Sequence, residues 1–203
     1  MGGFAVGVAA TFAPFFAIAP AATWRLFSYH LDRPPEVESL ASSIVHVAGL
    51  DFVRVQSYGS DNVAGTWPTA LAALSTLLVV VGIVAVALWM FRALNHDQRD
   101  AAGVLVTAVA ATLVAVVLFG KVISPQYMVW LLPAVLLVPG RWGRIGVATI
   151  LIAMPVTQLV FPPLFSSLVQ RAADLPVWLL FARNMLLVLL LVAVWPRALE
   201  RRS

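Results

Sequence analysis

The side chains that could do chemistry lie in two short polar clusters and at one isolated arginine. The first cluster lies within residues 29–39 and contains Tyr29, His30, Arg33 and Glu38. A guanidinium such as that of Arg33 binds phosphate through paired hydrogen bonds and keeps its charge. Tyr29 and His30 offer ring faces and donors suited to a sugar or a phosphate. The alternative is a solvated loop in which Arg33 pairs with a neighbouring carboxylate, worth at most about 1 kcal/mol.

The second cluster comprises Lys121, Ser124, Gln126 and Tyr127, packed around Pro125 at the edge of an apolar stretch. Proline fits the first turn of a helix because its missing N–H would be unbonded there. Free amides at the start of that helix, together with Lys121, would form an anion site. The alternative is a snorkelling lysine beside an interfacial tyrosine, which is common in membrane proteins.

Arg183 is the isolated cation, and it stands beside Asn184 in a long apolar stretch. An arginine in the middle of a membrane helix costs roughly 2.5–3.5 kcal/mol on insertion scales. Its neighbours along the helix are leucines, so a partner must come from another helix, a lipid headgroup or a substrate. Gln158 lies at a similar depth in the preceding stretch and is a candidate, whereas the alternative is snorkelling to the headgroups.

Composition places all three features in a membrane protein. Of 203 residues, 62% are apolar and 11% are charged, with a mean hydropathy of +0.96, far from the usage of soluble domains. A soluble enzyme and a disordered chain are excluded. The net charge of +4 is spread between apolar blocks, which excludes a nucleic-acid partner. The chain has no cysteine, no metal-ligand spacing and no glycine-rich phosphate motif, so we expect neither metal nor cofactor.

Apolar stretches of the length needed to cross a bilayer predict an all-α, polytopic transmembrane helical bundle of about six spans in a single domain. The expected spans are 4–22, 67–91, 101–119, 122–139, 145–165 and 177–195. Basic residues are denser in the connectors that share a side with the C-terminus. The positive-inside rule then predicts that both termini lie in the cytoplasm.

Residues 23–66 form the longest segment between spans and are expected to be an outer loop. Pro34-Pro35 ends any preceding helix, and residues 36–50 show the polar and apolar arcs of an amphipathic helix. At about 22 Å such a helix is too short to span the bilayer. We expect an interfacial or partly re-entrant helix whose polar arc faces a cavity. A surface helix with its polar face in water is the alternative.

The two clusters together resemble a family of bacterial membrane enzymes. The pattern Tyr29-x-x-x-Arg33-x-x-x-x-Glu38-Ser39, followed by Lys121-x-x-Ser124-Pro125-Gln126-Tyr127 and an apolar Trp130–Pro133 stretch, is similar to the C-terminal half of polytopic glycosyltransferases. The similarity is to family 87 of the C superfold, which includes actinobacterial polyprenol-phosphate-mannose-dependent mannosyltransferases. It covers roughly residues 20–140.

The resemblance implies transfer of a hexose, mannose in particular, from a polyprenyl-phosphate donor to a lipid or glycan acceptor at the outer face of the plasma membrane. It implies that Arg33, Lys121 and Arg183 bind the donor phosphate. It implies that the pocket is lined by Tyr29, His30, Glu38, Ser124, Gln126 and Tyr127. Members of that family are longer than this chain, and no residue here matches their acidic base. We therefore assign no catalytic residue and expect the C-terminal, donor-binding part of a larger enzyme.

Two alternatives of other classes stay open. A transporter or flippase for an anionic lipid or solute would place polar residues at the midplane on broken helices, often in repeated halves. A non-catalytic membrane subunit or a degenerate fragment would have no cavity lined by the two clusters.

Overall fold

The computed structural model describes residues 2–96, 100–170 and 174–196 and divides the chain into two compact units, Met1–Arg33 and Pro34–Ser203. The first unit is a pair of helices, α1 (Gly2–Ile18) and α2 (Pro20–Asp32). Ala19 leaves the helical conformation at φ −142°, and Pro20 then begins α2. The expected first span, 4–22, is therefore interrupted, and Tyr29 and His30 lie on a helix where a loop was expected.

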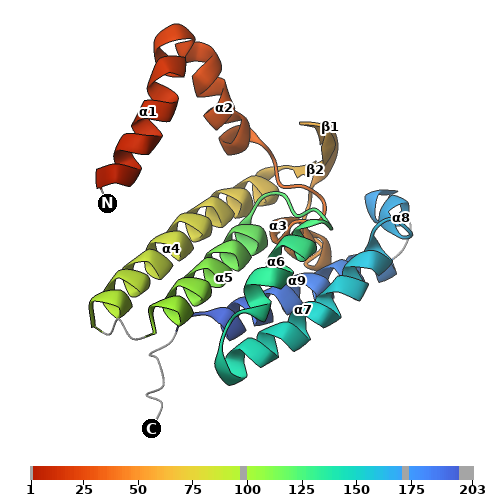
Figure 1. Cartoon of the computed structure of the whole chain (residues 1–203). Helices are drawn as coiled ribbons and strands as arrows, with labels where there is room; N and C mark the ends of the chain where they lie inside the picture. Colours follow the sequence, from red (N-terminus) through yellow and green to blue (C-terminus); the bar gives the residue numbers. More distant parts are fainter. Residues whose placement is uncertain (1, 97–99, 171–173, 197–203) are drawn as a thin grey trace. The chain divides into compact units, whose positions relative to one another are not determined.

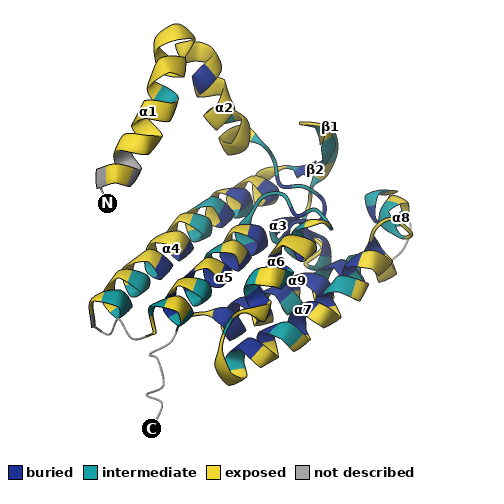
Figure 2. Cartoon of the chain, viewed as in Figure 1, coloured by how far each residue is buried: buried dark blue, intermediate teal, exposed yellow. Residues whose placement is uncertain are grey.

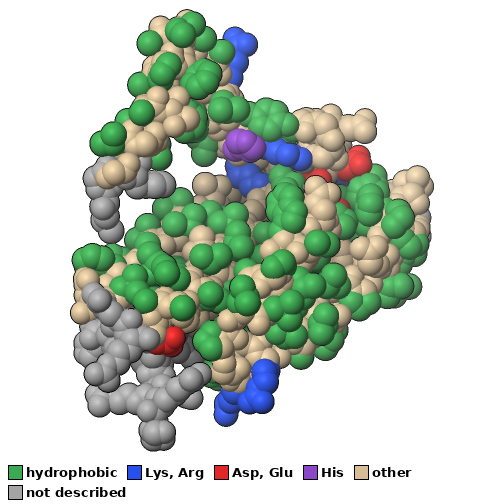
Figure 3. Space-filling view, in the orientation of Figure 1, with side chains coloured by type: hydrophobic (Ala, Val, Ile, Leu, Met, Phe, Trp, Pro, Cys, Tyr) green, Lys and Arg blue, Asp and Glu red, His purple; other side chains and the backbone are tan. Residues whose placement is uncertain are grey.

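The second unit is built around four long apolar helices: α4 (Thr66–His96), α5 (Ala101–Phe119), α7 (Gly140–Val160) and α9 (Asp174–Val194). Each is long and apolar enough to cross a membrane, which confirms the predicted all-α transmembrane bundle. Figure 1 shows them side by side as the body of this unit. Hydrophobic side chains cover most of the face drawn in Figure 3, as lipid contact requires.

Two shorter helices complete the bundle. The expected fourth span, 122–139, forms only α6 (Tyr127–Leu136), which at ten residues is about 15 Å long. The chain is irregular from Gly120 to Gln126, so those residues add no helical length. The second short helix, α8 (Phe165–Gln170), connects α7 to α9. Four of the six expected stretches thus form helices of spanning length within the described chain, and α1 and α6 are shorter apolar helices.

The end of the bundle at which α4 and α9 begin carries a small non-helical cap, which we call the loop end. Its strands β1 (Val53–Ser57) and β2 (Ser60–Ala64) pair antiparallel as a hairpin. Tyr58 and Gly59 turn the chain with φ of +55° and +73°, the geometry of a two-residue hairpin turn. Arg54 donates from Nη2 to the Leu168 carbonyl of α8 at 2.7 Å, which ties the hairpin to the bundle.

The core lies where α5, α6, α7 and α9 meet, and Figure 2 shows the buried sides of these helices turned toward one another. Small residues of α5, among them Ala110, Ala111 and Ala115, are fully buried and allow close helix approach. Gly82 of α4 lies against Ala115, so a side chain there would meet its methyl at 3.4 Å. The outer face of α4 carries exposed Leu77, Val81 and Leu88, as expected for a helix in contact with lipid.

Candidate functional site

The segment that follows Pro34-Pro35 forms a backbone bridge at Glu36 and a turn over residues 37–38 before it becomes helical. Val37 donates its N–H to the Asp61 carbonyl at 2.9 Å, and Val63 donates to the Pro35 carbonyl at 2.9 Å. Glu36 thereby forms an isolated bridge with Asn62, so this part of the segment lies beside β2. These backbone bonds are made by residues that were expected to begin the helix over 36–50.

Helix α3 (Leu40–Val47) is consequently eight residues long, and the predicted helix over 36–50 is wrong at both ends. Ser39 caps its start, accepting from the Ser42 N–H at 3.1 Å. Gly49 ends it in the left-handed region at φ +64°, a conformation that glycine adopts without steric cost. Because the fixed ends leave only two turns, α3 depends on packing against other helices for its stability.

The polar side of α3 is buried, not solvated. Ser39, Ser42 and Ser43 are inaccessible, and His46 is nearly so, with Nδ1 2.7 Å from the Ser42 carbonyl. The apolar residues Val37, Ala41 and Val45 are buried too. Both arcs therefore contact protein, which contradicts a surface helix with its polar face in water. Helix α9 is the element that packs against this polar arc.

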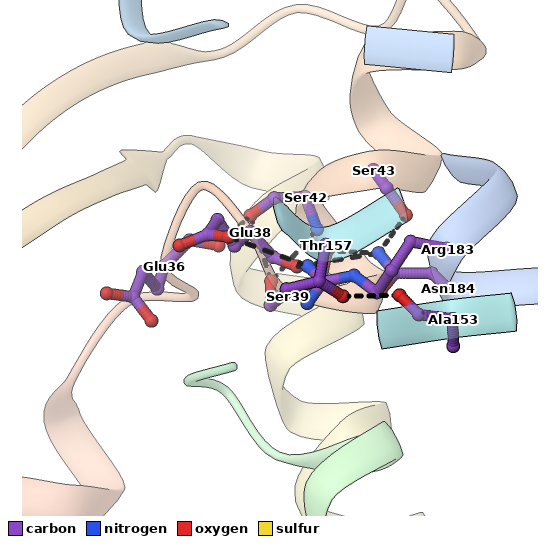
Figure 4. A network of polar contacts seen from close by, with 9 residues as sticks. All are labelled: Glu36, Glu38, Ser39, Ser42, Ser43, Ala153, Thr157, Arg183 and Asn184. Carbon is purple, nitrogen blue, oxygen red and sulfur yellow. Dashed lines mark hydrogen bonds and ion pairs between the residues drawn. The ribbon is translucent and has the colours of Figure 1, made fainter. Parts of the chain in front are cut away.

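Arg183 and Asn184 of α9 are the groups that meet this polar side, as Figure 4 shows. Arg183 donates from Nη2 to the Glu38 carbonyl at 2.8 Å, and the same atom lies 3.8 Å from Oε1 of the Glu38 carboxylate. Asn184 donates from Nδ2 to Ser43 Oγ at 2.9 Å and to the Ser39 carbonyl at 3.3 Å. We call these three residues, Glu38, Arg183 and Asn184, the Arg183 cluster.

Gln158 was one candidate partner for Arg183, but the contacts of Arg183 go to another residue. Gln158 is exposed on α7, and the neighbouring Thr157 is the residue that turns inward. Glu38 replaces it as the partner, 145 residues away in the sequence. Arg183 is the tenth residue of α9, so the Glu38 segment meets α9 about 14 Å below its first residue. The segment around α3 thus packs against the side of α9 and not only against its first turn.

Burial changes the acidity of Glu38. Desolvation raises the pKa of its carboxyl from 4.5 to about 7, the Arg183 cation acts in the opposite direction, and Glu36 adds a smaller rise. Figure 4 shows the Glu36 side chain pointing away from Arg183, so its carboxylate does not complete the pair. The loss of hydration therefore outweighs the attraction of the guanidinium, as is common for buried ion pairs.

The second cluster meets the Glu36 segment at the loop end. Glu36 donates its N–H to the Lys121 carbonyl at 2.8 Å, which joins the two chain segments that the sequence treats as one site. The first amides of α6 are already bonded, however: Tyr127 donates to Ser124, and Met128 donates to Pro125, at 2.9 and 3.2 Å. Val129 donates to Gln126 in the same way. The N–H groups of Tyr127, Met128 and Val129 are therefore not free to bind an anion.

Three of the remaining candidates, Tyr29, His30 and Arg33, lie in the first unit. On α2, Tyr29 and His30 pack edge to face with ring centroids 5.3 Å apart, and Arg33 forms the C-cap of that helix. Tyr127 of the second unit stacks on Trp130 at 4.7 Å. The structure thus brings Glu38 together with Arg183, and Lys121 together with Glu36, within the second unit.

Sequence reasoning missed Ser43 and the hairpin. The alternation Val53-Arg54-Val55-Gln56, followed by Tyr58-Gly59, was a strand-and-turn signal. Nothing in the sequence pointed to Ser43 as the acceptor for Asn184. Among the described residues, no group of three or more His, Asp or Glu side chains could hold a metal ion.

Comparison with known proteins adds no assignment: the chain matches no protein-family model, no curated protein and no solved structure.

Proposed function

We propose that this membrane protein binds a polyprenyl-phosphate-linked hexose, mannose by the resemblance, at its loop end and serves as the donor-binding part of a membrane glycosyltransferase. The observation that carries the proposal is the bond from the Glu36 N–H to the Lys121 carbonyl. It places the 34–39 segment beside the 121–127 segment at one end of a bundle of membrane-spanning length.

The chemistry of that end supports a lipid-linked phosphate. A polyprenyl tail must lie in the bilayer, whereas its phosphate must stay at the interface. Lys121 follows α5 by two residues and belongs to the same short segment as Ser124 and Gln126. A cation at this position stabilises the negative charge that accumulates on a departing phosphate. Tyr127, stacked on the exposed Trp130, adds an aromatic surface next to it.

Charge asymmetry supports an outward-facing loop end. Arg92 closes α4, while Arg141 and Arg144 open α7, all at the opposite end of the bundle. Under the positive-inside rule this basic end faces the cytoplasm, which directs the loop end to the outer surface. The same rule is the basis for proposing that both termini are cytoplasmic.

Transport is the second candidate, and the position of Arg183 favours it. A buried charge part-way along a spanning helix is typical of substrate or ion pathways. Within the described part of the chain, however, the Arg183 side chain contacts Glu38, and a pathway would need that pair to separate. We therefore rank glycosyl transfer first.

The proposal is tested by donor binding with the full chain in nanodiscs. Labelled polyprenyl-phosphate mannose should bind the unaltered protein, and Lys121→Ala should weaken binding by about 10- to 100-fold, the value of one charge-assisted contact. Arg92→Ala removes an exposed cation from the opposite end and should leave binding unchanged. Equal affinities for the wild type and Lys121→Ala, or an equal loss with Arg92→Ala, would refute the assignment.

A further inference from the structure

Four polar atoms of the Arg183 cluster are buried without a hydrogen-bond partner in the described part of the chain. They are Nε and Nη1 of Arg183, Oε1 of Glu38 and Oδ1 of Asn184. Arg183 is 1% exposed and Glu38 is 4% exposed, so bulk solvent does not reach these atoms. A buried polar atom without a partner costs about 1–3 kcal/mol, and more when it is charged. Such atoms concentrated in one cluster indicate a ligand.

The types of atom restrict what that ligand can be. Arg183 can only donate, through one N–H on Nε and two on Nη1, whereas Asn184 Oδ1 and an ionised Glu38 can only accept. An anion would satisfy Arg183 but would bring negative oxygens against the two acceptors. Moreover, the Glu38 carboxylate, 3.8 Å from the Arg183 guanidinium, already supplies the countercharge. A cation would meet the reverse conflict at Arg183.

A hydroxyl group both donates and accepts, so it matches donors and acceptors that lie side by side. We propose that the Arg183 cluster binds neutral hydroxyl groups, supplied either by water or by a sugar ring. Only the sugar source rests on the proposed function, and it would make these residues hexose-recognising, distinct from the phosphate-binding Lys121. This differs from the sequence expectation that Arg183 contacts the donor phosphate.

The scaffold of the cluster is suited to hold such a group. Asn184 is fixed by its bond to Ser43 Oγ, and Arg183 is fixed by the Glu38 carbonyl, so Nη2 and Nδ2 are occupied while Nε, Nη1 and Oδ1 remain available. The bonds that fix the two side chains go to α3 and its cap. Occupation of the available atoms should therefore stabilise α3 against local opening.

Hydrogen exchange of the amides in 36–47 tests this inference in the full chain in nanodiscs. The probes are methyl α-mannoside and inorganic phosphate at equal concentration. Methyl α-mannoside should slow exchange in the wild type, and phosphate should not. Arg183→Lys leaves the Glu38 carbonyl in place, removes the Nε and Nη1 donors, and should abolish the protection. Thr157→Val is the matched control, because its buried hydroxyl donates only to the Ala153 carbonyl of its own helix.

A second measurement separates the two sources. Radiolytic footprinting after a rapid change to ¹⁸O-water reports slowly exchanging water beside the side chains of 36–47 and 177–187. If water alone occupies the cluster, neither probe alters exchange, and a slow water signal is lost in Arg183→Lys. Protection by phosphate equal to that by the sugar would overturn the inference, as would the absence of both sugar protection and slow water. Lys121→Ala should keep the sugar protection, so failure of donor binding and failure of this inference give different results.

Discussion

Replacing Glu38 by glutamine should stabilise the protein at neutral pH, although it removes one partner of a buried ion pair. The pKa of the Glu38 carboxyl rises from 4.5 to about 7 in the folded protein, chiefly through burial. The folded state therefore binds this proton more tightly than the unfolded state does. Stability from this group is fully present below about pH 4.5 and is lost as the pH rises through 7.

The expected magnitude follows directly from these values. Each pKa unit is worth about 1.4 kcal/mol, so ionisation of Glu38 lowers the free energy of unfolding by about 3 kcal/mol. Glu38→Gln keeps the shape and the carbonyl that Arg183 and Asn184 bind, and it does not titrate. The two proteins should be similarly stable at about pH 4, and the variant should be more stable by about 3 kcal/mol at about pH 8.

Reversible unfolding by SDS in mixed micelles, followed by circular dichroism across this pH range, measures the difference. Thr157→Val serves as the control, because it alters a buried hydroxyl in the same layer without altering a titratable group. Its difference from the wild type should be independent of pH. A Glu38→Gln variant that becomes less stable than the wild type as the pH rises would show that the guanidinium outweighs desolvation, and the reasoning would fail.

Two further predictions concern the turn after α3 and the topology. Gly49→Ala should lower the free energy of unfolding by about 1–2 kcal/mol, because its φ of +64° is strained for alanine although no atom lies within 4 Å of the new methyl; unchanged SDS unfolding would contradict this. Since the chain has no cysteine, single cysteines at Gln56 and Asn95 report topology without background. A membrane-impermeant maleimide added to intact cells should label only Gln56→Cys, and labelling of both or of only Asn95→Cys would contradict an outward loop end.

The spanning helices could be predicted because length and apolarity alone determine them. Each of α4, α5, α7 and α9 is a stretch that the bilayer would accept as a helix whatever its neighbours do. The fourth expected span, 122–139, does not form a helix of spanning length, and the reason is local. Residues 120–126 form turns around Pro125, so α6 begins only at Tyr127.

The Glu36 segment shows why the polar region was harder to predict. The sequence does carry the polar and apolar pattern of an amphipathic helix. The N–H groups of Glu36 and Val37, however, bond to the carbonyls of Lys121 and Asp61, which lie far away in the sequence. Tertiary backbone bonds therefore replaced the helical ones that periodicity implied. By contrast, the need of Arg183 for a partner was predictable from energy alone. Choosing Glu38 over Gln158 required knowing that α3 packs against α9.

The energetic cost of the Arg183 pair suggests what the pair does for the fold. Because desolvation outweighs the attraction between Arg183 and Glu38, the two charges do not explain the stability of the fold around them. The shortest contacts of Arg183 and Asn184 go instead to the Glu38 carbonyl and to Ser43. Carbonyls of a non-helical segment cannot be left unbonded among membrane helices. The donors of Arg183 and Asn184 therefore allow a non-helical segment to pack within the bundle. An apolar replacement of Arg183 would suit an ordinary spanning helix, but here it should expel residues 36–39.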